Sequence, residues 1–98
     1  MEKTKEIVID LSEIRYLYVF FKLLIEKLEL PEITGMTVDS LSDFLREPWE
    51  EDWHVKFIGV SKTNDDIRQE LSLVLEMFDR VKEFQKRANN EFTWEIEQ

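Results

Sequence analysis

The run of residues that follows Asp66 constrains this 98-residue chain more than any other segment. Its apolar side chains recur at intervals of three or four residues, at Ile67, Leu71, Val74, Phe78 and Val81. This spacing puts them on one stripe of an α-helix, and it predicts about five turns that end near Ala88. Asn64 or Asp65 is expected to cap the start of this helix. The stripe has to be covered by the rest of the chain, so the other elements must supply a core.

Three shorter segments are typical of β-strands. Residues 6–10 (EIVID) are β-branched and bounded by charge, as in a buried strand. In residues 53–60 (WHVKFIGV), the side chains of one set alternate with those of the other, which is the period of a strand. The two sets are Trp53, Val55 and Phe57, and His54, Lys56 and Ile58. Residues 91–98 (EFTWEIEQ) also alternate, and their charged side favours a place at the margin of a sheet.

Two further helices are predicted between the first two strands. Residues 16–30 (YLYVFFKLLIEKLEL) carry an apolar face at helical spacing. Pro31 is expected to end this helix, because a residue before proline avoids the α region. Gly35 then gives a turn, and Thr37 is a suitable N-cap for a short helix over residues 38–46.

The predicted order is therefore strand, helix, helix, strand, helix, strand. Connections that contain helices favour parallel neighbouring strands joined by right-handed crossovers. We expect an α/β fold with a three-stranded parallel sheet packed by helices. The length allows one modest core, so residues 1–98 are expected to form a single domain.

The charge balance restricts the partners of the chain. It carries 22 acidic against 13 basic residues, a net charge of −9. Nucleic acids and anionic membranes need a basic surface, so neither is an expected partner, whereas a basic protein would be attracted. The sequence has no cysteine and no apolar run long enough to span a bilayer. We expect a cytoplasmic protein, monomeric when free, without a metal or other cofactor.

Two aspartates of the short helix form an unusual pair. Asp39 and Asp43 are four residues apart with no cation between them, and like charges at this spacing cost an isolated helix about 0.3 kcal/mol. At about 100° per residue, both point away from the apolar side of the helix, with Ser40 and Ser42 beside them. That apolar side consists of Val38, Leu41, Phe44 and Leu45. The sequence thus predicts an accessible anionic ridge.

This pair has several interpretations. The charges can be a solvated face, because the helix dipole favours an anion at Asp39 and Asp43 can pair with Arg46. A catalytic carboxylate pair needs a cleft and two different environments, which a convex helix does not offer. A Mg²⁺ or Ca²⁺ site needs more oxygen ligands, and only Glu32 is an obvious further donor. Finally, the carboxylates can enter a basic cleft of another protein and accept contacts from arginine.

The spacing of residues around the pair is a second pattern. The first strand is followed by Ile14 and Arg15, and the first helix runs into Leu-Pro-Glu at residues 30–32. The next matching positions follow without a gap, at Gly35, Asp39, Leu41, Asp43 and Leu45. In these features, and in the segment VLEMFDRVK at residues 74–82 and the last strand, the chain resembles the barstar family of intracellular ribonuclease inhibitors.

The resemblance implies a function as well as a fold. Barstar-like proteins place the second helix and the loop before it in the active site of a nuclease, where the aspartates take the positions of substrate phosphates. By this resemblance Asp39 and Asp43 are the anchors, and Gly35 permits the close approach of the loop. The other implied partner-binding residues are Ile33, Thr34, Met36, Ser42, Arg46, Asp79 and Arg80. The implied partner is a basic nuclease toxin.

Several positions depart from the family pattern. Two tyrosines of the family are Ile33 and Thr34 here, and the tryptophan between the aspartates is Ser42. The long helix has Arg80 where the family has an acid, with Asp79 one residue earlier. A toxin other than the family's usual ribonuclease is therefore expected, although the two retained aspartates still favour an enzyme that handles phosphates.

Two classes of function follow from these patterns. The first is an immunity protein that inhibits a basic nuclease, and the second is an acidic interaction module of the same fold with a non-nuclease partner. An enzyme is not expected, because the sequence contains no recognisable nucleophile, metal cluster or phosphate-binding loop. His54, the one histidine, is expected on an edge strand or in a local ion pair.

Overall fold

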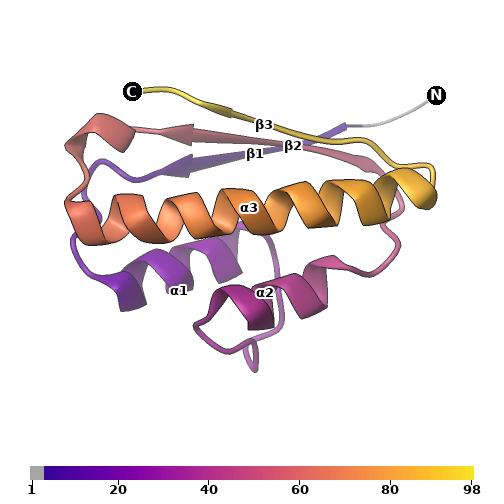
Figure 1. Cartoon of the computed structure of the whole chain (residues 1–98), viewed down its shortest axis with the longest axis horizontal. Helices are drawn as coiled ribbons and strands as arrows, with labels where there is room; N and C mark the ends of the chain where they lie inside the picture. Colours follow the sequence, from indigo (N-terminus) through magenta and orange to yellow (C-terminus); the bar gives the residue numbers. More distant parts are fainter. Residues whose placement is uncertain (1–3) are drawn as a thin grey trace.

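The computed structural model describes residues 4–98 and has the predicted order of elements (Figure 1). The elements are β1 (Thr4–Asp10), α1 (Leu17–Lys27), α2 (Val38–Leu45), β2 (Asp52–Ile58), the 3-10 helix η1 (Val60–Lys62), α3 (Asp65–Arg87) and β3 (Phe92–Ile96). Both pairs of neighbouring strands are parallel. The predicted α/β fold with a three-stranded parallel sheet is confirmed.

The sheet has the order β1-β2-β3, so β3 lies at an edge as its charged side predicted. In the central strand, Val55 pairs with Ile7 of β1 and with Trp94 of β3. The three α-helices lie on one side of the sheet, with α3 running along it and α2 farthest from it (Figure 1). This arrangement leaves α2 on the outer surface of the helical layer.

The core lies between the sheet and the helices. The predicted stripe of α3 is buried, at Ile67, Leu71, Val74, Phe78 and Val81. The central strand contributes Val55 and Phe57, which have no exposed surface. The rings of Phe78 and Phe92 meet edge to face with centroids 4.9 Å apart, a favoured geometry for aromatic pairs. Helix α3 has 23 residues, about six turns, so it is somewhat longer than predicted.

Helix α1 ends earlier than Pro31 predicts. The backbone of Glu29 is left-handed, with φ of 56°. The N–H of Glu29 donates to the carbonyl of Glu26 at 3.1 Å, and the N–H of Leu30 donates to the carbonyl of Ile25 at 2.9 Å. These are the two bonds of a Schellman motif. The helix therefore ends through its own C-terminal hydrogen bonds, and the proline follows a chain that has already turned.

Strand β2 also ends before its predicted limit at Val60, because Gly59 has φ of 71°. A Cβ atom on Gly59 would lie 2.7 Å from Cβ of Ser12 and 2.8 Å from its nitrogen. Glycine is thus required both by the backbone conformation and by the close neighbour. The chain then passes through η1 to the predicted cap, where Asn64 Oδ1 accepts the N–H of Ile67 at 3.0 Å.

His54 lies on the central strand, so the expectation of an edge strand is wrong. Its Nδ1 is 2.7 Å from Thr93 Oγ1, and its Nε2 is 3.0 Å from Glu95 Oε2. The alternative expectation of a local acidic partner is confirmed by Glu95. All three side chains belong to the sheet, so His54 ties β2 to β3.

A buried glutamine holds α2 against α3. Gln85 of α3 has no exposed surface. Its Nε2 donates to the carbonyl oxygens of Leu45 at 3.0 Å and Glu47 at 2.7 Å, and its Oε1 accepts the N–H of Trp49 at 3.3 Å. The last turn of α2 and the residues after it are therefore fixed by one side chain of the long helix.

Candidate protein-binding site

Helix α2 starts at the predicted cap, where Thr37 Oγ1 accepts the N–H of Ser40 at 3.1 Å. The apolar side of the helix is buried at Leu41 and Leu45. Because the helix is fixed at its start and along this side, its opposite side faces solvent. Asp39 and Asp43 are both exposed there, so the predicted exposure of the two carboxylates is confirmed.

The two carboxylates differ in their neighbours. Asp43 Oδ1 lies 3.6 Å from Arg46 Nη2, and the two side chains are 75% and 46% exposed. A pair this exposed contributes only about 0.2–1 kcal/mol, so Arg46 can leave it at small cost. Asp39 forms no ion pair within residues 4–98. Both carboxylates are thus available to cations from another molecule.

The loop between α1 and α2 places apolar side chains next to this helix. Ile33 is 85% exposed and Met36 is 44% exposed. Gly35 lies between them, and a Cβ atom there would be 2.7 Å from Ser40 Oγ and 3.3 Å from Ser40 Cβ. The close approach that Gly35 permits in this structure is therefore to α2 of its own chain, which draws the loop onto the start of the helix.

Two of the residues expected at the surface are buried. Thr34 and Ser42 are each only 5% exposed, so the prediction that Ser42 flanks the aspartates in solvent is wrong. Ser42 is small and directly follows the buried Leu41 on α2, the helix that packs against α3. Thr34 Oγ1 has no hydrogen-bond partner within the described part of the chain. A partner would meet the ridge without direct contact to these two side chains.

The remaining predicted residues lie on another element. Asp79 and Arg80 are exposed on α3, the helix against which α2 packs. Among residues 4–98, neither forms an ion pair with the aspartates of α2. The structure thus pairs Asp43 with Arg46, and no ion pair among the described residues links the α3 residues to the two aspartates.

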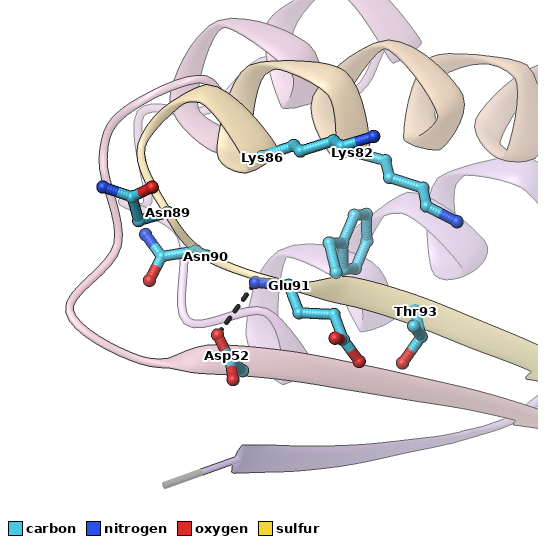
Figure 2. Close-up of a pocket in the computed structure, with 8 residues that line it drawn as sticks. Asp52, Lys82, Lys86, Asn89, Asn90, Glu91 and Thr93 are labelled. Atoms are coloured by element: carbon cyan, nitrogen blue, oxygen red, sulfur yellow. Dashed lines mark hydrogen bonds between the residues drawn. The ribbon is translucent and has the colours of Figure 1, made fainter. Parts of the chain in front are cut away.

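A cavity of about 470 Å³ lies between the end of α3 and the start of β3 (Figure 2). Its charged lining consists of Lys82, Lys86, Asp52 and Glu91. Asp52 Oδ1 accepts the N–H of Glu91 at 2.8 Å, so one carboxylate is already used within the fold. Two cations and two carboxylates give this cavity no net charge to select a ligand, and none of the predicted site residues lines it.

The described residues offer little for other kinds of site. Within residues 4–98, no three carboxylate or imidazole side chains are grouped so that they could hold a metal ion. The same part of the chain contains no helix with the length and apolar character needed to cross a membrane. The exposed aspartate pair of α2 is therefore the feature from which we build the site.

Sequence reasoning missed two exposed aromatic residues at the start of α1. Tyr16 and Tyr18 are 71% and 59% exposed. The signal in the sequence was partial: Tyr18 falls outside the face formed by Phe20, Phe21 and Leu24, whereas Tyr16 is four residues before Phe20 and shares its side. Exposed aromatic residues indicate an interaction surface where they belong to a contiguous apolar patch.

Fold and surface together define a small α/β protein with two exposed carboxylates on a short outer helix. A family model described as Barstar (barnase inhibitor) matches residues 4–97, and the chain belongs to the barstar family. Members of this family are inhibitors rather than enzymes, and they bind a ribonuclease. A search of curated proteins finds no match to the chain.

Proposed function

We propose that this chain is a cytoplasmic immunity protein that binds and inhibits a basic nuclease, above all a ribonuclease. In this proposal α2 and the loop before it enter the active site of the enzyme. The observation that carries the proposal is the exposed pair Asp39 and Asp43, on a chain that belongs to a family of ribonuclease inhibitors.

The chemistry of the pair supports this role. An active site that handles RNA holds cations for the phosphates, and a carboxylate accepts charge-assisted hydrogen bonds from the same cations. Four residues of helix separate the two Cα atoms by about 6 Å along the axis, so Asp39 and Asp43 can reach different cations. The net charge of −9 adds a long-range attraction to a basic enzyme.

The departures from the family pattern affect the choice of enzyme. The exposed contacts of the loop are aliphatic and thioether groups, from Ile33 and Met36, instead of two tyrosines. On α3 the exposed Arg80 replaces an acid. A cation at this position repels a basic partner surface, which supports a target other than the usual ribonuclease of the family.

The test uses immobilised protein to capture a partner from the source cell, followed by a fluorescent RNA cleavage assay on the captured fraction and on barnase. The double variant Asp39→Ala, Asp43→Ala removes the pair. The double variant Glu95→Ala, Glu97→Ala is its control, because it changes the net charge equally on the face of the sheet that the helices do not cover.

Wild type and the control should inhibit the captured ribonuclease equally. The aspartate variant should inhibit it about 10²–10⁴-fold less, since each lost charge-assisted contact costs about 1.5–3 kcal/mol. Equal inhibition by all three proteins contradicts the proposal. Capture of one non-nuclease partner by all three supports the acidic interaction module instead.

A further inference from the structure

A shallow groove of about 410 Å³ lies between the start of α1 and the loop before α2. Most of its lining is apolar and comes from Leu17, Tyr18, Phe21, Met36 and Val38. Phe21 is buried and Val38 is half-buried, whereas the other three side chains are exposed. Glu70 of α3 is the only charged residue in the lining.

Three exposed apolar residues line this groove, and two more are close to them in the sequence. Of the eight large hydrophobic residues that are exposed within residues 4–98, five lie at residues 16–18 and 33–36. They are Tyr16, Leu17, Tyr18, Ile33 and Met36. Burying an aliphatic or aromatic side chain contributes about 1.5–3 kcal/mol, and both tyrosine and methionine are enriched in protein interfaces. A cluster of this kind indicates a surface that a protein partner covers.

The groove reaches the first residue of α2. Val38 lines the groove, and the next residue of the chain is Asp39. Glu70 adds a carboxylate on the α3 side of the groove. An apolar side chain that enters the groove thus lies near the carboxylate of Glu70, which favours a cation beside it and disfavours an acidic neighbour.

We propose that this groove receives an aliphatic or aromatic side chain of the inhibited nuclease, next to a lysine or arginine that pairs with Glu70. The inference rests on the proposed function, because it adds a second contact to the same partner. Cationic active sites of nucleases resemble one another, so an aspartate pair selects weakly among them. The groove contacts residues outside that centre, where differences between enzymes give discrimination.

A first test uses two small probes with the full chain, N-acetyl-Trp-Arg-amide and N-acetyl-Trp-Glu-amide, followed by amide chemical shifts in ¹⁵N NMR spectra. The arginine probe should shift residues 17–21 and 36–38, and it should bind about threefold more tightly than the glutamate probe. Glu70→Gln should abolish that difference. Equal binding of the two probes to wild type, or shifts that map only to other surfaces, overturns the proposal.

A second test measures inhibition of the nuclease captured by the wild type. Met36→Ser and Tyr18→Ser should each weaken inhibition about tenfold, because each removes apolar contact area from the complex. Val8→Ser is the matched control, since Val8 is half-exposed on the open face of the sheet, and it should leave inhibition unchanged. Circular dichroism checks that all three variants are folded.

The outcomes separate this proposal from the proposed function. If the aspartate variant loses inhibition while Met36→Ser and Tyr18→Ser keep it, the groove proposal is overturned and the proposed function stands. Analytical ultracentrifugation tests a different occupant. A wild-type dimer that Met36→Ser dissociates also overturns the proposal, because a second copy of this chain would then fill the groove.

Discussion

Replacing Gln85 with methionine tests how α2 is held in position. The two side chains have similar lengths, so the substitution removes the amide and leaves no large cavity. In the wild type, the amide nitrogen of Gln85 donates to the carbonyl oxygens of Leu45 and Glu47. Its oxygen accepts from the N–H of Trp49 and from Asn90 Nδ2, each at 3.3 Å. Methionine replaces none of these contacts.

The loss of stability depends on how deeply the groups that lose a hydrogen bond to Gln85 are buried. The bond from Gln85 to the carbonyl of Leu45 is buried, and a buried acceptor without a partner costs about 1–3 kcal/mol. The other three contacts are only partly buried, so water can replace them at a cost of about 0.5 kcal/mol each. The sum is about 2.5–4.5 kcal/mol, and it lowers the melting temperature of a domain of this size by roughly 10–35 °C.

Urea unfolding followed by circular dichroism measures this effect. Gln69→Met is the control, because Gln69 is an exposed residue of the same helix and its replacement should change stability by less than about 0.5 kcal/mol. A loss below about 1 kcal/mol for Gln85→Met would falsify the reasoning, since the buried carbonyl would then have found another donor.

Three further changes probe the loop and the sheet. Gly35→Ala should lower the free energy of unfolding by about 1 kcal/mol, because the new Cβ meets Ser40 Oγ; adding Ser40→Ala should recover part of the loss in urea unfolding, and no recovery would rule out this contact as its cause. Thr34→Val should raise stability by about 0.5–1 kcal/mol, because it removes a buried hydroxyl that has no partner; a loss would show that the hydroxyl is satisfied. The hydrogen bond and the charge of Glu97 raise the pKa of Lys56 above its ordinary 10.5. The contribution of Lys56 to the free energy of unfolding is therefore complete below about pH 10.5, and it is lost as the pH rises through the raised pKa. The urea midpoint of wild type should fall more than that of Lys56→Met between about pH 9 and about pH 12, and parallel curves would exclude the coupling.

Local sequence signals predicted most of the elements because their causes are local. The caps at Thr37 and Asn64 depend on a side chain and a backbone N–H three residues apart. The stripe of α3 depends on a period that any amphipathic helix shares. The ends of α1 and β2 were predicted less well. Left-handed residues end both elements, at Glu29 and Gly59, and the close contact of Gly59 with Ser12 comes from a distant part of the chain.

The sequence by itself determined that Asp39 and Asp43 face outward, because the position of two leucines on a short helix fixes its opposite side. It did not determine which neighbouring side chains share that surface. Burial of Thr34 and Ser42, and the groove beside Met36, were decided by the tertiary structure. The physical reason is that exposure depends on which element packs alongside, and the packing of α2 against α3 brings together residues about 40 positions apart, as the bond between Leu45 and Gln85 shows.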